Sequence, residues 1–376
     1  MKICIVNEGF EMGGVEKVTI QLANSLQEKG HDLFLIDFSG KNETFYQVNR
    51  EVKKNNIIKQ RTVRRKIIGK IIKIKYCIEK KSINILNLYK EQTFDLINFL
   101  DKTNCDVLIV NQGVLTALIP IIKNKIPRLK IIAWQHNEYE VYINKYSTNY
   151  INDYLSGVKL ADSVICLTQA DQQKFVNLNK QSKYIYNPLT IKEVNKISNI
   201  NSKNIIFVGR LKLEQKGLDY LIKIGEKITG DWKIIIAGDG PDKKKFLNMI
   251  KENKLENKII LKGTLNNEEL VDFYLSGAVF ISTSRWEGFG LVITEAMSFG
   301  LPIISFNNNG PTEILNNGEY GVLIEKNNID EFVVKLIELL NNPIKRMYFQ
   351  KKSLRRVVDF RKENIVCTWD RYLKNL

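Results

Sequence analysis

The sequence predicts an α/β protein made of two doubly wound domains, each built on a mostly parallel sheet. Two observations lead to this prediction. First, 376 residues exceed the length over which a single hydrophobic core keeps growing, so two domains are expected. Second, short runs rich in Ile and Val that are apolar throughout alternate with helical patterns. Such an alternation indicates parallel strands buried on both faces.

The first strand–helix series occupies residues 1–188, the predicted N-terminal, acceptor-side domain. It opens with a strand at Lys2–Val6, an amphipathic helix at Val15–Lys29 and a strand at Asp32–Phe38. Further strands are expected at Val107–Val110, Lys130–Trp134, Ser163–Leu167 and Tyr184–Tyr186. Periodic helical segments separate most of these runs.

Residues 189–203 lose strong patterning and are interpreted as an interdomain linker, so that residues 204–376 form the second domain. Its strands are expected at Asn204–Val208, Lys233–Ala237, Lys258–Leu261, Ala278–Ser282 and Pro302–Ser305. Its helices are expected at Gly217–Ile228, Lys243–Asn253, Asn267–Ser276 and Leu291–Phe299, and residues 328–376 read as closing helices. Open α/β sheets bind ligands at the carboxyl ends of their strands, so a cleft between the domains is the expected place for chemistry.

Composition narrows the class of protein. The apolar fraction of 44% and the aromatic fraction of 10% exclude general disorder. Five scattered cysteines without a C-x-x-C pair indicate free thiols of a reducing cytoplasm, and with two histidines no metal site is expected. The N-terminus has no signal-peptide character, and no apolar run is long enough to span a bilayer. We therefore expect a cytoplasmic protein, or one at the inner face of the cell membrane.

The net charge of +16 is concentrated locally. Residues 53–81 contain 12 basic residues and a single acid, Glu79. Within residues 61–81, isoleucines are interleaved with these cations. A basic amphipathic helix of this kind can lie on an anionic membrane surface. The alternative is a domain helix with a solvated basic face. Nucleic acid is not an expected partner, because no binding motif is recognisable.

Two glycine-containing turns follow predicted strands. Gly13-Gly14-Val15-Glu16 opens the first helix, where close-approaching backbone amides could bind a ligand, although a tight turn explains the glycines equally well. The spacing is not G-x-G-x-x-G. In the second domain, Gly209-Arg210 ends a strand and Lys216-Gly217 begins a helix. Two cations at such a junction can neutralise a leaving diphosphate, whereas two solvated surface cations are the simpler alternative.

The segment from Glu287 to Glu295 carries the most information. It follows an apolar strand, and Leu291 begins a helix whose N-terminal amides are freed by Gly288 and Gly290 to bind an anion. Glu287 can accept hydrogen bonds from sugar hydroxyls. Glu295 lies about one turn into the helix, within reach of a second diol. Two carboxylates could also be a glycosidase acid/base pair. A glycosidase, however, does not need a phosphate-binding helix terminus between them.

In this order the motifs resemble the retaining glycosyltransferases of family 4, which have the GT-B fold of two Rossmann-like domains facing each other across a cleft. The resemblance covers nearly the whole chain. The matching pieces are Gly13-Gly14-Val15-Glu16, His136, Gly209-Arg210 with Lys216-Gly217, Gly238-Asp239-Gly240-Pro241, the E-x7-E pair Glu287 and Glu295, Gly300-Leu301-Pro302, and Gly310-Pro311-Thr312-Glu313.

The resemblance implies roles for individual residues. The residues implied in catalysis are His136, Arg210, Lys216 and Glu287. The residues implied in donor binding are Gly14, Arg210, Lys216, Thr264, Leu265, Glu287, Phe289, Gly290, Leu291 and Glu295. Among these, Arg210 and Lys216 would bind the diphosphate, and Glu295 the nucleotide ribose. His136 would lie beside the donor sugar, although a lone histidine is often structural.

The reaction implied is transfer of a hexose or N-acetylhexosamine from a nucleoside diphosphate, foremost UDP, to a glycan or lipid-linked glycan, with retention and without a metal or other cofactor. Synthesis of lipopolysaccharide or capsule is the expected setting. The alternatives are a nucleotide-sugar epimerase or a phosphorylase of the same fold, a noncatalytic binding protein, and a dinucleotide-dependent oxidoreductase. In the last, Asp37 would hold the ribose. The missing G-x-G-x-x-G disfavours that reading.

Overall fold

The computed structural model describes residues 1–63, 67–72, 74 and 82–376, and its contacts divide the chain into two compact units. Unit 1 comprises Met1–Pro188 and Glu363–Leu376, and unit 2 comprises Leu189–Lys362. This division differs from the predicted domains in two places. Residues 189–203 lie within unit 2 instead of forming a separate linker, and the last 14 residues belong to unit 1.

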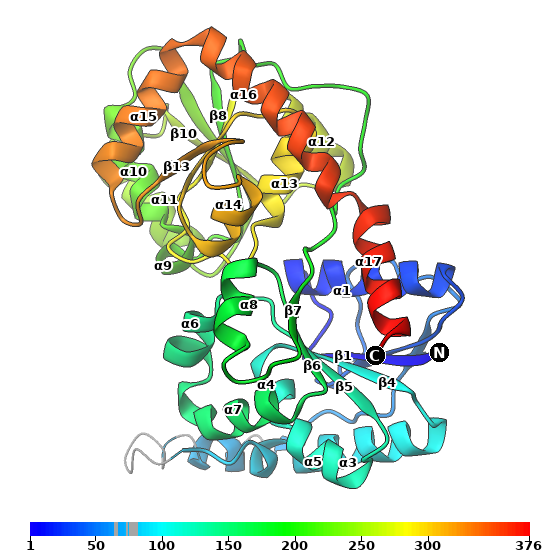
Figure 1. Ribbon diagram of the computed structural model, residues 1–376. Helices are drawn as coiled ribbons and strands as arrows, with labels where there is room; N and C mark the ends of the chain where they lie inside the picture. Colours follow the sequence, from blue (N-terminus) through cyan, green and yellow to red (C-terminus); the bar gives the residue numbers. More distant parts are fainter. Residues whose placement is uncertain (64–66, 73, 75–81) are drawn as a thin grey trace. The chain divides into compact units, whose positions relative to one another are not determined.

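Unit 1 contains a seven-stranded parallel sheet in the order β3-β2-β1-β4-β5-β6-β7 (Figure 1). Its strands are β1 (Lys2–Asn7), β2 (Asp32–Asp37), β3 (Lys53–Asn55), β4 (Val107–Asn111), β5 (Lys130–Trp134), β6 (Ser163–Cys166) and β7 (Ser182–Tyr184). The central strands are apolar and buried throughout, as expected for a sheet covered on both faces. In register, Ile3 of β1 pairs with Leu33 of β2 and with Val107 of β4.

The edge strands of unit 1 are where the sequence was least informative. β3 (Lys53–Asn55) was not predicted, because a three-residue edge strand of Lys, Lys and Asn carries no apolar pattern. β7 lies at Ser182–Tyr184 instead of the predicted Tyr184–Tyr186. The predicted start was late because β7 exposes Lys183 and Tyr184, so its first residues lack the apolar character of a buried strand.

Helices cover both faces of this sheet, with α1 on one side and α3 and α5 on the other (Figure 1). The α-helices of unit 1 whose bounds lie fully within the described residues are α1 (Gly14–Glu28), α3 (Ile85–Thr103), α4 (Gln112–Ala117), α5 (Ile119–Lys125), α6 (Tyr139–Val141), α7 (Ile151–Leu160), α8 (Gln169–Phe175) and α17 (Lys362–Lys374). Short η1 (Tyr142–Tyr146) and η2 (Thr148–Tyr150) turns connect α6 to α7. Leu96, Leu100, Ile109 and Val164 are among the fully buried residues of this unit.

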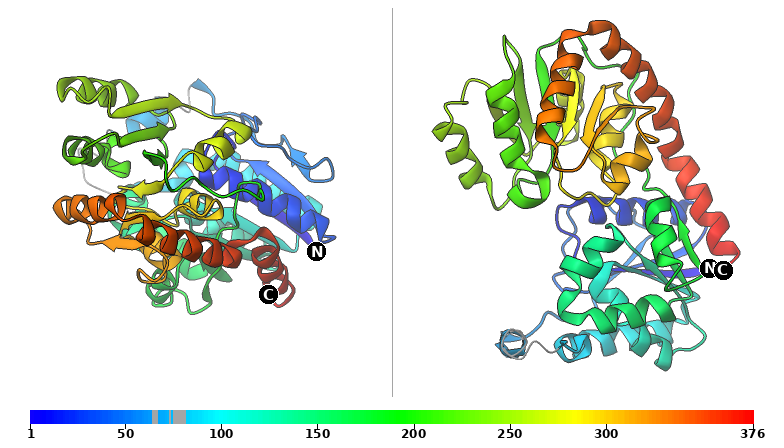
Figure 2. Two further views of the ribbon diagram at one scale, coloured as in Figure 1. Left: turned by 90° about the horizontal axis from the view of Figure 1, so that it is seen from above. Right: turned by 60° about the vertical axis from the view of Figure 1, so that its left-hand side comes forward.

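The C-terminal helix α17 completes unit 1. The rings of Trp369 and Trp134 lie 5.0 Å apart and are both fully buried. His31, which precedes β2, contacts Asp370 of α17 with 2.8 Å between His31 Nε2 and Asp370 Oδ1. The two chain ends consequently lie near each other in this unit (Figure 2). His31 therefore has a structural role.

Unit 2 contains a six-stranded parallel sheet in the order β10-β9-β8-β11-β12-β13. Its strands are β8 (Asn204–Val208), β9 (Lys233–Ala237), β10 (Ile259–Gly263), β11 (Val279–Ser282), β12 (Ile303–Phe306) and β13 (Val322–Ile324). The first five correspond to predicted strands within one or two residues at each end. β13 was not predicted, because three residues are too few to show a pattern.

The helices of unit 2 alternate with its strands, as the sequence indicated. They are α9 (Leu213–Lys216), α10 (Leu218–Lys227), α11 (Lys243–Glu252), α12 (Asn267–Leu275), α13 (Leu291–Ser298), α14 (Asn309–Ile314), α15 (Ile329–Asn341) and α16 (Pro343–Arg356), followed by the 3-10 turn η3 (Val357–Phe360). A separate core of buried residues forms here, including Leu221, Ile234, Ile281 and Leu336. None of the helices in the described parts of the chain combines the length and apolar character needed to cross a bilayer.

Candidate functional site

The order of strands in unit 2 identifies where a ligand would bind. The sheet runs outward in both directions from β8 and β11, which lie side by side. At such a switch point the loops that follow the two strands diverge and leave a crevice at the carboxyl ends. The loop after β8 carries Arg210 and Lys216, and the loop after β11 carries Glu287.

Lys216 and Glu287 meet at this switch point. The Lys216 ammonium forms an ion pair with Oε2 of Glu287. The same oxygen accepts a hydrogen bond from Ser284 Oγ at 3.2 Å. The two side chains of the pair are only 13% and 16% exposed, so water screens their charges less than it would at the surface. Two predicted site residues, 71 positions apart in the chain, are thus in direct contact.

Backbone contacts hold the two loops together. Thr283 Oγ1 donates to the carbonyl of Lys216 at 2.8 Å, and the amide of Arg285 donates to the carbonyl of Gln215 at 2.8 Å. Gly217 has a φ of +61°, and a Cβ at this position would lie 2.2 Å from the carbonyl oxygen of Thr283. Glycine is therefore needed after Lys216 for both its backbone conformation and the close approach of the loops.

The side chain of Arg285 also helps to hold these two loops together. Its two terminal nitrogens donate to the two carboxylate oxygens of Asp219 in α10, at 2.9 and 2.6 Å. Its guanidinium lies over the ring of Tyr220, 4.2 Å from the centroid, and also donates to the carbonyl of Glu214 at 3.1 Å. The planar fork of arginine suits this bidentate and stacked geometry. Arg285 therefore fixes the loop that carries Glu287 against the helices beside Lys216.

The N-terminus of α13 lies on the same loop. Gly290 is its N-cap with a φ of +107°, and the first intrahelical bond runs from Ile293 to the carbonyl of Gly290. The amides of Leu291 and Val292 precede that bond and so belong to the positive end of the helix. Phe289 is buried, and Gly310 packs on its backbone, where a Cβ would lie 2.1 Å from the Phe289 carbonyl oxygen. The close packing of Gly310 thereby fixes the conformation of this loop.

Glu295 is more deeply placed than the sequence suggested. It is 4% exposed, and its two carboxylate oxygens accept hydrogen bonds from Thr190 Oγ1 and from Tyr274 OH, the latter at 2.9 Å. Burial, followed by the charge of Glu295, raises the pKa of Tyr274 well above its usual value, so the phenol stays a donor.

The other predicted residues of unit 2 lie on neighbouring loops of the same sheet edge. Arg210 is exposed directly after β8. Thr264 and Leu265 follow β10, where Gly263 has a φ of +75° and accepts a hydrogen bond from the amide of Gly238 at 2.8 Å. The loop after β9 is thus connected to the one after β10. Thr264 is exposed and Leu265 is half-buried.

His136 lies in unit 1, just after β5. It is buried, and burial lowers its pKa from 6.5 to about 3, so it is neutral at physiological pH. Its Nε2 is 3.2 Å from Oδ1 of Asn111, whose amide nitrogen donates to Thr19 Oγ1 at 2.9 Å. Because that amide orientation leaves Oδ1 as an acceptor, we assign the imidazole hydrogen to Nε2. Nδ1 is then the ring's acceptor. The backbone amide of His136 donates a hydrogen bond to Tyr142 OH at 3.0 Å.

Gly14 opens α1, after Gly13, which is extended with a φ of −177°. The Glu16 side chain folds back over Gly13, and a Cβ added at Gly13 would lie only 2.1 Å from Glu16 Oε2. Gly14 and His136 belong to unit 1, and the other predicted site residues belong to unit 2. Each set lies near the carboxyl ends of the strands of its own sheet.

Sequence reasoning missed several partners of these residues. Ser284 lies three residues before Glu287, outside the motif, and was not predicted to contact it. Thr190 lies in the segment taken as a linker, and Tyr274 lies on α12, remote from any motif. Asn111 at the end of β4 could have been found, since a polar residue that ends a buried strand faces the ligand-binding edge.

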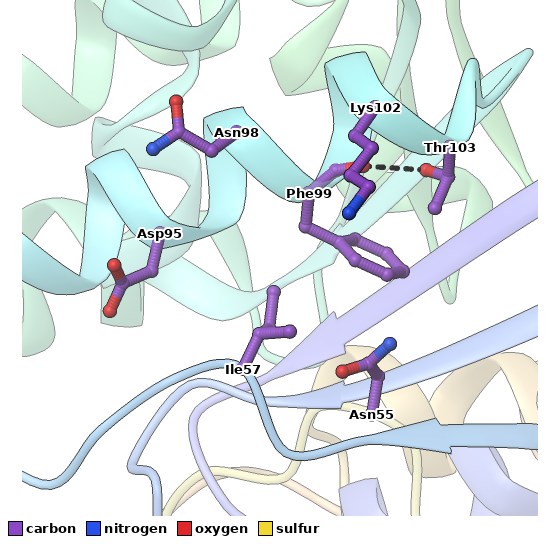
Figure 3. A pocket seen from close by; sticks show the side chains of 7 residues that line it. All are labelled: Asn55, Ile57, Asp95, Asn98, Phe99, Lys102 and Thr103. Carbon is purple, nitrogen blue, oxygen red and sulfur yellow. Dashed lines mark hydrogen bonds between the residues drawn. The ribbon is translucent and has the colours of Figure 1, made fainter.

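Other features of the described residues do not extend the site. No group of three or more His, Cys, Asp or Glu side chains in the described part of the chain could hold a metal ion. A pocket in unit 1 lies between the segment that ends β3 and helix α3, where Asn55 and Ile57 face Asp95, Phe99 and Lys102 (Figure 3). It contains none of the predicted site residues.

Two Rossmann-like units, one with a cation–carboxylate pair and a glycine-capped helix at its switch point, define the class of GT-B glycosyltransferases. The comparisons agree with this class. Residues 12–192 match the family described as Glycosyltransferase Family 4, and residues 190–356 match Glycosyl transferases group 1. A Haemophilus influenzae protein described as an uncharacterized glycosyltransferase is 31% identical over 97% of both chains. The chain therefore belongs to the GT-B glycosyltransferases.

Two solved structures share the fold. The lipopolysaccharide outer core galactosyltransferase WaaB has a TM-score of 0.75 at 20% identity, over the full length of both chains. Anabaena HepE, solved in complex with UDP-glucose, has a TM-score of 0.75 at 17% identity, also over the full length of both chains. At these identities the likeness describes the architecture alone.

Proposed function

We propose that the protein transfers a hexose or N-acetylhexosamine from a nucleoside-diphosphate sugar, foremost a UDP-sugar, to a glycan or lipid-linked glycan, with retention of the anomeric configuration. The observation that carries the proposal is the Lys216–Glu287 pair at the switch point of unit 2, beside the N-terminus of α13. The likeness to HepE, solved with UDP-glucose, supports the choice of donor, and that to WaaB supports surface-glycan synthesis.

The reaction breaks the bond between the sugar carbon C1 and the diphosphate oxygen, and negative charge develops on the diphosphate. Lys216, Arg210 and the amides that begin α13 would stabilise this charge without a metal. Glu287 would accept hydrogen bonds from hydroxyls of the transferred sugar, and Glu295 from the ribose. In the ligand-free protein Glu287 already neutralises Lys216, so the donor would share this ammonium. The lysine is therefore positioned before the donor binds.

Donor binding tests the proposal directly. We expect at least one of a set of UDP-, GDP- and ADP-sugars to raise the melting temperature and to be hydrolysed slowly. Lys216→Met should weaken donor binding about 10- to 100-fold, because a charge-assisted hydrogen bond contributes about 1.5–3 kcal/mol. Lys223→Met removes an exposed lysine on α10 and is the matched control. If no nucleotide sugar binds, or if both variants bind equally, the proposal is wrong.

The oxidoreductase alternative is disfavoured by the role of Asp37. Its Oδ1 accepts a hydrogen bond from the amide of Ser39 and its Oδ2 one from the amide of Asn42, both at 2.8 Å. The carboxylate is buried and stabilises the turn after β2, so an acidic residue at the end of this strand is accounted for without a cofactor. Adding NAD to the same assay tests this alternative, since NAD would then stabilise the protein and the nucleotide sugars would not.

The described part of the basic segment supports membrane association. Val63, Ile67, Ile71 and Ile74 are 74%, 53%, 58% and 59% exposed. Their spacing of four, four and three residues places them on one face of a helix. Residues 64–66, 73 and 75–81 lie outside the described residues. We propose that this apolar face inserts into an anionic bilayer at the inner face of the cell membrane, with the surrounding cations against its headgroups.

Vesicle binding tests this part of the proposal. The protein should sediment with phosphatidylglycerol-containing vesicles and less with pure phosphatidylcholine. Replacing both Ile67 and Ile71 by aspartate should abolish the difference, because two charges would enter the bilayer interface. Val334→Asp on α15, where the valine is 55% exposed, is the control for an added surface charge. Equal sedimentation of all three proteins would contradict membrane association.

A further inference from the structure

A pocket at the outer edge of the unit 1 sheet has no part in the proposed reaction. It has a volume of about 490 Å³ and lies between helix α3 and the segment that ends β3 (Figure 3). Strand β3 is the last strand on its side of the sheet, and β2 separates it from β1. The pocket is therefore separate from the loops after β1 and β5, which carry Gly14 and His136. Its size is within the range of about 300–1,000 Å³ that is usual for small-molecule sites.

One face of helix α3 forms a wall of the pocket. Asp95, Asn98, Phe99 and Lys102 have the spacing i, i+3, i+4 and i+7, which places them on the same side of the helix over two turns. Asp95 and Asn98 lie toward one end of the pocket, and Lys102 lies toward the other (Figure 3). The wall therefore presents a carboxylate and an amide at one end and an ammonium at the other.

Apolar side chains form the floor of the pocket. Phe99 is 8% exposed, and its ring packs edge-on against that of Phe34, with 5.4 Å between the centroids. Ile57, on the segment after β3, is half-buried and packs against the same core. Thr103 Oγ1 donates a hydrogen bond to the carbonyl of Phe99 at 2.7 Å (Figure 3). The floor is thus continuous with the core of unit 1 and is in place before any ligand binds.

The polar side chains of the pocket are open to a ligand. Within the described part of the chain, four of them form no hydrogen bond or ion pair, namely those of Asn55, Asp95, Asn98 and Lys102. Asp95 and Lys102 carry opposite charges, but the two helical turns between them leave these charges unpaired. Asn55 and Asp95 are also half-buried. Two amides, a carboxylate and an ammonium therefore surround an apolar floor.

These groups decide which class of ligand fits. One carboxylate and one ammonium leave the pocket without a net charge, so neither a phosphate nor a cation is favoured. A purely apolar ligand would remove water from the polar side chains without offering them a hydrogen bond, which is unfavourable. A sugar ring offers hydroxyls that both donate and accept, together with an apolar face of C–H groups. A sugar therefore matches both the polar wall and the apolar floor.

We propose that this pocket is a glycan-binding site, in which Asp95 and Asn98 bind hydroxyls of a sugar ring whose apolar face lies on Ile57 and Phe99. Lys102, about 10 Å further along the helix axis, contacts the next ring of the glycan. A site of this kind would keep a glycan chain at the enzyme between transfers. That role rests on the proposed transferase function, whereas the site itself depends only on residues of unit 1.

Binding of simple glycosides to the full chain tests the proposal. Methyl α-glucopyranoside, methyl β-galactopyranoside and methyl N-acetyl-β-glucosaminide are titrated in saturation-transfer NMR experiments, and UDP binding is measured on the same samples. We expect at least one glycoside to bind, and Asp95→Ala to weaken it fivefold or more while UDP binding stays unchanged. Asp101→Ala removes an exposed carboxylate of the same helix, paired with Arg128, and should leave the affinity for the glycoside unchanged.

A second variant guards against misfolding. Asn98 is exposed, so Asn98→Ala should keep the melting temperature and still weaken the same glycoside at least twofold. If no glycoside binds the wild-type protein, or if Asp95→Ala and Asn98→Ala both bind it as well as wild type does, the pocket is not a glycan site. Inorganic phosphate that binds in place of the glycosides, and is lost in Lys102→Met, would overturn the ligand class. Glycoside binding that depends on Asp95 in a protein that does not bind UDP would instead overturn the transferase function and leave this site standing.

Discussion

Arg285 offers the sharpest test of how the donor site is held together. Its guanidinium makes two bonds to Asp219 and covers the ring of Tyr220. Arg285→Lys keeps the positive charge but loses the fork. A charge-assisted pair contributes about 1.5–3 kcal/mol when buried. Here the two side chains are 25% and 28% exposed, so we discount this to about 1–2 kcal/mol. The weaker stacking adds about 0.5 kcal/mol.

The expected loss is therefore about 2 kcal/mol in the free energy of unfolding of unit 2. For a unit of this size that corresponds to a decrease of about 4–8 °C in melting temperature. Because the loop that carries Glu287 is anchored less firmly, the Kd for the donor should also rise, by about three- to tenfold. Calorimetry and donor titration measure the two effects on the same protein.

A double-mutant cycle decides whether the pair with Asp219 is responsible. Arg285→Lys, Asp219→Asn and the double variant should show a coupling energy of at least 1 kcal/mol. Lys335→Met, which breaks an exposed ion pair with Glu338, should leave the melting temperature unchanged. A coupling energy within about 0.5 kcal/mol of zero would refute the assignment of Arg285 as the residue that fixes this loop.

Three further predictions follow from buried or titrating groups. Tyr274→Phe removes a buried donor to Glu295 and should lower the free energy of unfolding by about 1–3 kcal/mol, as measured with urea. His136 binds its proton with a pKa of about 3 when folded and about 6.5 when unfolded, so the stability that it contributes is complete above pH 6.5 and is lost as the pH falls toward 3; His136→Gln should flatten this part of the stability profile. Glu8 binds its proton with a pKa of about 7 when folded and about 4.5 when unfolded, so stability is lost as the pH rises through this range; Glu8→Gln should therefore raise the free energy of unfolding more at pH 8 than at pH 4, and an equal effect at both would contradict this assignment.

The fold was largely predictable from the sequence because buried parallel strands are apolar throughout. The central strands of both sheets were located in this way. The strands that were missed, β3 and β13, are three-residue edge strands without such a pattern. The helix α17 was counted with the second domain as a closing helix, whereas its contacts group it with unit 1. Its amphipathic pattern shows that one face is buried, but nothing in the pattern indicates which of two cores that face contacts.

The contact between Lys216 and Glu287 was predictable because both residues follow strand ends. Lys216 and Glu287 follow strands that turned out to be neighbours, so their contact follows from topology. The surroundings of Glu295 were not predictable, because Thr190 and Tyr274 come from segments with no sequence signal for the contact. Whether a side chain is buried depends on which other elements pack over it, and no local motif encodes that packing. The assigned roles of these residues remain predictions that the variants above would test.

Because α17 belongs to unit 1, the two units do not simply follow one another along the chain. Unit 2 is one continuous segment, and it separates the two segments, Met1–Pro188 and Glu363–Leu376, that form unit 1. Trp134 of unit 1 contacts Trp369 only after all of unit 2 has been synthesised. On the ribosome, the whole of unit 2 therefore emerges before the helix that completes unit 1.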